Sequence, residues 1–325
     1  MSPNSNNRPI PTGPLVRMVA MMLVGTFVGC SGEVHLEPGT AGSDYRLQGE
    51  YRSASAPFAA QVIALGSGRF RGVLLLGGLP GEGFDGRSRH EAAGRSRDGS
   101  VEFSGAWRGT AREDELVVPT RNGEAFSLQR VVRRSPTEGA QPPPDAEILF
   151  AHGPTRHLAQ GSADDRGLLG VPARSARPHR DIALHVEFRT PYMPGSDDQG
   201  RGNSGIYLQE RYEVQVLDSF GLAAHPRGAG ALYEAFSPSV NMSYPPLQWQ
   251  TYDIEFSEAR FDHDGRKIAP ARISVRHNGV LIHDDVALLG PTGLGKDETP
   301  EPNPLLLQDH WDPVFFRNVW LVRRP

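Results

Sequence analysis

Cysteine is almost absent from this sequence, whose 325 residues include only Cys30. A single thiol cannot form an intramolecular disulfide framework, so the fold must depend on its hydrophobic core. Long apolar runs are also scarce, and 38% hydrophobic with 22% charged residues suits a globular chain better than a membrane bundle. Lys and Arg (34) do not outnumber Asp and Glu (38), and the net charge is −4. Without a basic stripe, nucleic-acid binding has little support.

Glycine and proline, in contrast, are plentiful, with 37 and 28 residues. Both residues interrupt helices and mark turns, so they favour many short strands. No convincing amphipathic helix pattern is present, whereas alternating strand-like segments recur between turn signals. The sequence therefore predicts an all-β protein, and its length allows two domains.

The N-terminal segment predicts export. Its one apolar run, Met18–Val28, is too short to span a bilayer but fits the core of a signal peptide. The run ends just before Cys30 in a segment that resembles the bacterial lipoprotein cleavage box, which implies acylation of Cys30. We therefore predict a signal peptide over 1–30, a tether over 31–44, and a membrane anchor facing the periplasm or in the outer membrane. The alternative is ordinary secretory cleavage with Cys30 as a bystander.

Composition divides the remaining chain into two predicted domains. Residues 45–134 form short apolar runs separated by glycine-rich turns, which predict a smaller accessory β domain. Residues 135–145 contain four prolines, which predict a semi-rigid linker between the two domains. Residues 146–325 contain further strand patterns, including a hairpin signal at Asn278-Gly279. We expect this second domain to be an antiparallel β-sandwich or jelly roll.

One motif in the second domain is specific enough to suggest a family. The sequence NSGIYLQ…YEVQVLD, from Asn203 to Asp218, resembles the 3-keto-disaccharide hydrolase domain, and the resemblance extends over residues 147–323. It implies a concanavalin A-like jelly-roll β-sandwich that cleaves glycosides oxidised to a ketone at C3. The family often has Arg where this chain has Gln209. If that Arg holds an anionic or carbonyl group, this chain has lost a charge and retained an amide.

Strand geometry turns the motif into a candidate site. Alternate residues of a strand share a face, so Tyr207 and Gln209 form one polar set, and Glu213 and Gln215 another. A two-residue turn at Glu210-Arg211 would mix the polar and apolar faces. We therefore predict a three-residue connection or a bulge that pairs Gln209 with Glu213 and Tyr207 with Gln215. The four side chains would then line a sugar-binding groove; the alternative is a solvated outer face of an ordinary sheet.

Three further residues are candidates with open alternatives. Asn203 either contacts ligand or shapes the loop before the strand. Asp218 either reaches the site or caps the following loop. His310 either acts as a base or stacks on a sugar, or is simply exposed. No tight His/Cys cluster indicates zinc, no cofactor is assigned, and a divalent metal ion, held by Glu213 or by Asp197-Asp198, is left open.

These residues lead to a functional prediction for the cell envelope. We expect a carbohydrate-active hydrolase or lyase in which Glu213 is the base or a metal ligand, Gln209 and Gln215 orient the sugar, and His310 is the acid. Glu213 is the one carboxylate that the sequence assigns to the groove, so ordinary glycoside hydrolysis, which uses two carboxylates, fits the sequence less well. The alternatives are a non-catalytic carbohydrate-binding module and a structural envelope lipoprotein. The partners expected are a 3-keto-glycoside or related sugar and the membrane.

Overall fold

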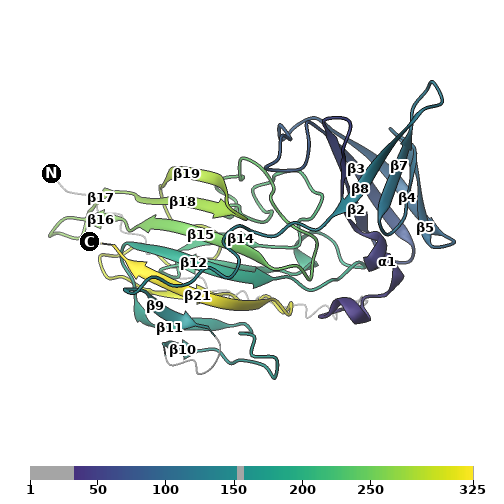
Figure 1. Ribbon diagram of the computed structural model, residues 1–325. Helices are drawn as coiled ribbons and strands as arrows, with labels where there is room; N and C mark the ends of the chain where they lie inside the picture. The colour runs from purple at the N-terminus through teal and green to yellow at the C-terminus, as the bar shows by residue number, and fades with distance from the viewer. Residues whose placement is uncertain (1–32, 152–156, 325) are drawn as a thin grey trace, which may run out of the picture. The chain divides into compact units, whose positions relative to one another are not determined.

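The protein is built almost entirely from β-strands, as the sequence predicts. The computed structural model describes residues 33–151 and 157–324, so Cys30 and the predicted signal peptide lie outside the described residues. The described chain forms an eight-stranded barrel and two facing sheets of five and six strands (Figure 1). Its one α-helix is the six-residue α1 (Gly42–Leu47). Among these residues, no helix combines the length and apolar character needed to cross a membrane.

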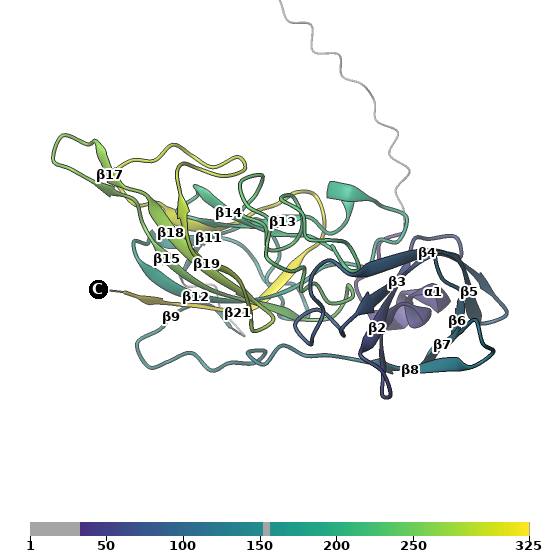
Figure 2. The same cartoon turned by 90° about the horizontal axis from the view of Figure 1, so that it is seen from above.

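The first eight strands close into an antiparallel barrel, because β1 pairs with both β2 and β8 (Figure 2). Closure removes the exposed strand edges that an open sheet of this size would leave. Alternate residues point inward, and Tyr51, Phe70 and Leu128 are among those that fill the interior. The strands are β1 (Gly49–Ser53), β2 (Phe58–Ala64), β3 (Arg69–Leu76), β4 (Arg89–Arg97), β5 (Ser100–Gly105), β6 (Gly109–Ala111), β7 (Glu115–Pro119) and β8 (Ala125–Val131).

The segment before the barrel is packed against the protein, so the prediction of a tether over 31–44 is wrong for its described part. The backbone groups of His35 and Tyr192 exchange two hydrogen bonds of 3.0 Å. Ala41 and Leu47 are buried with the barrel core. The few apolar residues of this segment are enough to dock it, although the segment as a whole looks polar in sequence.

The second half of the chain folds into two facing antiparallel sheets, which is consistent with a β-sandwich. The five-stranded sheet has the order β10-β11-β20-β13-β14, and the six-stranded sheet has the order β19-β18-β15-β12-β21-β9. Their strands are β9 (Glu147–Phe150), β10 (Leu158–Gln160), β11 (Ala173–Pro178), β12 (Ile182–Arg189), β13 (Ser204–Leu208), β14 (Tyr212–Val216), β15 (Gln250–Ser257), β18 (Ala271–His277), β19 (Val280–Leu288), β20 (Pro304–Leu307) and β21 (Phe315–Arg323). A separate small ribbon pairs β16 (Arg260–Phe261) with β17 (Lys267–Ala269).

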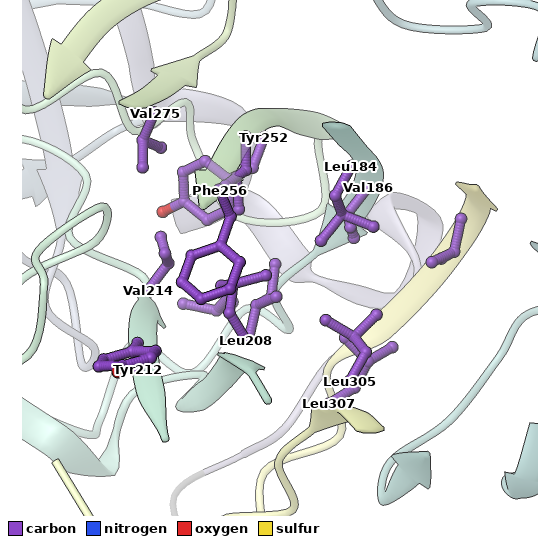
Figure 3. Close-up of a cluster of buried hydrophobic side chains, with 14 of the residues drawn as sticks. Leu184, Val186, Leu208, Tyr212, Val214, Tyr252, Phe256, Val275, Leu305 and Leu307 are labelled. Atoms are coloured by element: carbon purple, nitrogen blue, oxygen red, sulfur yellow. The ribbon is translucent and has the colours of Figure 1, made fainter. Parts of the chain in front are cut away.

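The sandwich core lies between the inner faces of these two sheets (Figure 3). Leu184 of β12 and Phe256 of β15 come from the six-stranded sheet, and Leu208 of β13 and Val214 of β14 come from the five-stranded sheet. Each such buried side chain stabilises the fold by about 1.5–3 kcal/mol relative to exposure. Because alternate side chains of β13 and β14 point into this core, the remaining side chains of these two strands point to the opposite face of the sheet.

Residues 135–145, predicted as a linker, lie on the outer face of the six-stranded sheet. Ser135 Oγ lies 2.6 Å from Thr251 Oγ1, and the Thr137 hydroxyl donates to Asp253 Oδ2 at 2.7 Å. The backbone N–H of Gly139 donates to Glu187 Oε1 at 2.6 Å. The segment is thus held in place by hydrogen bonds to the sheet.

Candidate functional site

The hairpin β13–β14 is closed by a three-residue loop, residues 209–211, as predicted. The predicted pairing is wrong by two residues, however, because Leu208 pairs with Tyr212 and Tyr207 pairs with Glu213. The first two loop residues have positive φ angles of 53° and 55°, so the chain reverses as soon as β13 ends. A backbone hydrogen bond of 3.0 Å from the third loop residue to the Leu208 carbonyl closes the turn.

The two faces of this hairpin carry the residues that strand parity assigns to them. Ile206 and Val214 are paired across the strands and point into the sandwich core. Tyr207 and Glu213 are paired on the opposite face. A shift of two residues in register keeps every side chain on its face, which is why the predicted polar face survives the wrong pairing.

Above the polar face lies a pocket of about 260 Å³. Five residues predicted from the sequence line it together, namely Asn203, Tyr207, Glu213, Gln215 and His310. His310 comes from the loop between β20 and β21, about 100 positions from the hairpin. The pocket therefore gathers residues from separate parts of the chain around the Glu213 carboxylate. Its remaining lining residues are Gln199, Tyr233, Glu234, Gly293, Leu294 and Gln308.

The central group is the Glu213 carboxylate, which is 3% exposed. Burial raises its pKa to about 7, because desolvation penalises the charged form. The Tyr207 hydroxyl donates a 2.7 Å hydrogen bond to Oε2 and lowers that pKa in part, while the charge of Glu234 raises it. A carboxyl group with this pKa can accept and return a proton near neutral pH.

Glycine residues enclose this carboxylate on two sides. A Cβ atom on Gly205 would lie 2.4 Å from Glu213 Oε1, and a Cβ atom on Gly293 would lie 2.0 Å from Oε2. Gly293 also has a φ of +59°, which L side chains rarely adopt. The loop around it is tied to the hairpin, because the Glu213 N–H donates to Thr292 Oγ1 at 2.7 Å and the Leu294 N–H donates to the Tyr207 hydroxyl at 3.3 Å. The pocket wall is thus built around the carboxylate.

Amide side chains form the next part of the wall. Gln215 is oriented so that its nitrogen donates to Glu213 Oε1 at 3.2 Å and to the Ser204 carbonyl at 2.8 Å, because both partners are acceptors. Asn203 Nδ2 donates to the Gln199 carbonyl at 2.9 Å, and this bond holds the loop before β13. The pocket therefore offers neutral polar groups that suit sugar hydroxyl and carbonyl oxygens.

Gln209 does not line the pocket, so its predicted role in binding sugar is wrong. Its amide nitrogen donates to the His179 carbonyl and to Glu258 Oε2, both at 2.8 Å. Its amide oxygen accepts from Arg211 at 2.9 Å. Gln209 has left the strand and lies in the loop with positive φ, so strand parity no longer governs the direction of its side chain.

Asp218 also does not line the pocket. It caps the following loop, which is the structural alternative given for it above. Its Oδ2 accepts a 2.6 Å hydrogen bond from Arg201 Nε, and the two side chains are 0% and 9% exposed. Its Oδ1 accepts from the Phe220 N–H at 3.2 Å, which caps the loop after β14. Phe220 packs in one apolar cluster with Ile63 of the barrel. Asp218 therefore belongs to the contact between the barrel and the sandwich.

Several pocket residues could not be found by sequence reasoning, and Glu234 is the most important. It adds a second carboxylate, so the expectation of a single groove carboxylate is wrong. Its loop reaches the pocket because Leu232 bridges Val214 at the free edge of β14, and the Tyr233 N–H donates to the Glu213 carbonyl at 3.2 Å. This loop has no strand or helix period, so its sequence carries no signal of its position.

A metal centre has no support from the geometry of the described residues. Within residues 33–151 and 157–324, no group of three or more His, Cys, Asp or Glu side chains could hold a metal ion. Asp197 and Asp198 do not line the pocket.

Comparisons with known proteins bear on the sandwich. Residues 173–322 match the model of the 3-keto-alpha-glucoside-1,2-lyase-like domain. A proposed glycosyl hydrolase from Parabacteroides distasonis is 27% identical, with 56% of this chain and 84% of that chain covered and a TM-score of 0.49. A second proposed glycosyl hydrolase from the same organism is 18% identical, with coverage of 55% and 99% and a TM-score of 0.38. No curated protein matches the sequence.

Proposed function

We propose that this chain, whose residues 173–322 form a 3-keto-alpha-glucoside-1,2-lyase-like domain, cleaves 3-keto-glycosides by elimination followed by hydration. The family match supports a carbohydrate-active, glycoside hydrolase-like role for the domain. The observation that carries the finer proposal is the buried Glu213 carboxyl group. It lies in a pocket with amide donors, and burial raises its pKa to about 7. An elimination needs one such base, and it does not need a nucleophile on the opposite face of the sugar.

The first step is removal of the C2 proton by Glu213. A ketone at C3 acidifies this proton, because the electron pair of the broken C2–H bond moves into an enolate on the C3 oxygen. Gln308, whose amide nitrogen makes a single 3.4 Å hydrogen bond to the Tyr207 hydroxyl, is the pocket amide with a donor available to that oxygen. Tyr207 is already engaged, since its hydroxyl donates to Glu213 and holds the carboxylate in place.

The second step breaks the C1–O bond. The enolate returns its electron pair to re-form the C3 carbonyl, a C1=C2 double bond forms, and the leaving oxygen departs. His310 lines the same pocket and is the acid that protonates this oxygen. Water then adds to C1 and gives one proton to His310, while the proton held by Glu213 returns to C2. The products are a 3-keto sugar and an alcohol, and both catalytic groups end in their starting protonation states.

Glu234 supports a second candidate function, ordinary glycoside hydrolysis. Its carboxylate shares the pocket with that of Glu213, and two carboxylates flanking the bond are what direct hydrolysis requires. That reaction needs no ketone, so it would act on unoxidised glycosides. Binding without catalysis is a third candidate, because a lectin-like sandwich alone does not imply an enzyme.

The test uses the chain without its first 30 residues and a pair of substrates, methyl 3-keto-α-glucoside and methyl α-glucoside. We expect turnover of the ketone alone, with loss of at least about 100-fold in Glu213→Gln. Asp285→Asn is the matched control, because it removes an exposed carboxylate paired with Arg272. A substrate deuterated at C2 should turn over more slowly or lose its label to the solvent, because elimination breaks the C2–H bond, whereas direct hydrolysis leaves that bond intact. Turnover at the unlabelled rate with the label fully retained at C2 would overturn the elimination mechanism.

The cellular location is part of the proposal. The segment ending at Cys30 supports acylation of that residue, which would anchor the protein in the cell envelope. Expression of the full chain with radiolabelled palmitate in a bacterial host tests this. We expect label in the wild type and none in Cys30→Ser. Labelling of Cys30→Ser, or an unlabelled wild type, would contradict the anchor.

The proposal also includes the fold class of the sandwich domain. The two facing antiparallel sheets support a concanavalin A-like jelly roll for the sandwich. An experimental structure with the jelly-roll strand connections is the expected result, and a different connection order would contradict it.

A further inference from the structure

Two large exposed apolar side chains belong to the pocket wall or follow it directly in the chain. Trp311 and Leu294 are each 88% exposed. Leu294 lines the pocket itself, and the Trp311 ring lies 5.2 Å from the ring of His310, which also lines it. Single exposed apolar residues are common on protein surfaces, but one of these two lines the pocket and the ring of the other contacts a lining residue.

Both residues are held by the same parts of the chain that build the site. The Trp311 N–H donates to Asp309 Oδ1 at 2.9 Å, and Trp311 has a φ of 65°, a conformation that costs free energy in a residue of this size. Asp312, the next residue, accepts a 2.7 Å hydrogen bond from the Asn203 N–H. The Leu294 N–H donates to the Tyr207 hydroxyl. The backbone at each apolar side chain is therefore fixed relative to Glu213 and Asn203.

We propose that Trp311 and Leu294 form a platform for the leaving group of the substrate, and that this leaving group is an aromatic ring. The platform adjoins His310, which the proposed mechanism places at the leaving oxygen. An indole face and a leucine side chain offer dispersion and ring stacking without hydrogen bonds. A flat phenol-like aglycone can stack on the indole over its whole face, whereas a second sugar offers only the C–H groups of one face. This inference rests on the proposed function and names the substrate class.

The test compares phenyl and methyl 3-keto-α-glucosides with the chain lacking its first 30 residues. In the wild type we expect a lower KM for the phenyl substrate. In Trp311→Ala, the phenyl-to-methyl ratio of kcat/KM falls about tenfold through KM, because stacking acts on bound substrate and transition state alike. Trp311→Phe restores most of the ratio. Leu289→Ala is the control, since Leu289 is 80% exposed but does not line the pocket, and we expect it to leave the ratio unchanged.

A second measurement separates the platform from the reaction. Binding of phenyl α-glucoside and methyl α-glucoside is measured by calorimetry, which needs no turnover. Weaker binding of the phenyl compound to Trp311→Ala than to the wild type, with methyl binding unaltered, supports the platform even if no ketone is cleaved. An unchanged phenyl-to-methyl ratio in both kinetics and binding overturns it. Absence of turnover with intact phenyl-selective binding would instead overturn the elimination reaction.

Discussion

The Tyr207 hydroxyl and the Glu213 carboxylate lie 2.7 Å apart on directly paired residues of β13 and β14. Burial and the neighbouring carboxylate raise the pKa of Tyr207 far above its ordinary value, so its hydroxyl remains a neutral donor. The same burial raises the pKa of Glu213. The pair therefore consists of a fixed donor and a carboxyl group that changes charge near neutral pH, and this difference determines how the site should respond to pH.

The first prediction concerns the pH dependence of the reaction. A base must be ionised, so kcat/KM for a 3-keto-glucoside should rise with pH through about 7, the raised pKa of Glu213. Tyr207→Phe removes a donor that favours the ionised form, so the rising limb should move up by about one pH unit. A kcat/KM profile from pH 5 to 9 measures both. A limb that stays in place in Tyr207→Phe would show that another group is the base.

The second prediction concerns stability. The folded protein holds the Glu213 proton up to about pH 7, whereas the unfolded chain releases it near the ordinary value of 4.5. Between these values the folded state binds more protons, so this group makes stability fall as pH rises. Glu213→Gln removes the effect. Its stability relative to wild type should therefore increase by about 3 kcal/mol from pH 5 to pH 8. Urea unfolding at both pH values measures the difference.

The outcome of the stability experiment is distinct from that of the kinetic one. If Glu213→Gln has the same stability relative to wild type at pH 5 and pH 8, the carboxyl group is not buried as described. If the difference is present but activity remains, the carboxyl is buried and plays no catalytic part. The variant therefore tests burial and catalysis separately.

The sequence predicts the site where local periodicity governs it. Strand parity places Tyr207 and Glu213 on one face, and the core on the other face enforces this. It could not place Gln209, because two successive residues with positive φ take that side chain out of the strand. It also could not place Glu234, whose loop is positioned by contacts with β14 that are remote in sequence.

For the fold too, local sequence patterns predict one part of the structure, and contacts between residues distant in sequence determine the rest. Alternating apolar patterns and turn residues correctly predict many of the strands in both domains of the described chain. Closure of the barrel depends on the pairing of β1 with β8, which are nearly 80 residues apart, and no local pattern encodes it. Docking of residues 33–47 likewise depends on a few contacts, such as the bridge between His35 and Tyr192.

The third prediction concerns Asp218, which belongs to the structure and not to the pocket. Asp218→Asn leaves the buried Arg201 without its counter-ion and should destabilise the protein by about 3–5 kcal/mol. The control is Asp285→Asn, which breaks an exposed pair with Arg272 and should cost about 0–1 kcal/mol. Urea unfolding of both variants at pH 7 gives the comparison. Equal losses would contradict the buried pairing of Asp218 with Arg201.

The fourth prediction concerns the glycine beside the carboxylate. Gly293→Ala places a methyl group where Glu213 Oε2 lies and also strains a backbone with a φ of +59°. The loop or the carboxylate must then move, and a displacement of about 1 Å is enough to reduce kcat/KM about 100-fold. Gly290→Ala is the matched control in the same loop, because its new methyl group meets no atom within 4 Å and it is not among the residues with positive φ. We expect it to retain activity. Circular dichroism shows whether both variants are folded. If they are, and Gly293→Ala is as active as Gly290→Ala, the reaction does not need the close approach of this loop to Glu213. The proposed position of the base in the pocket would then be wrong.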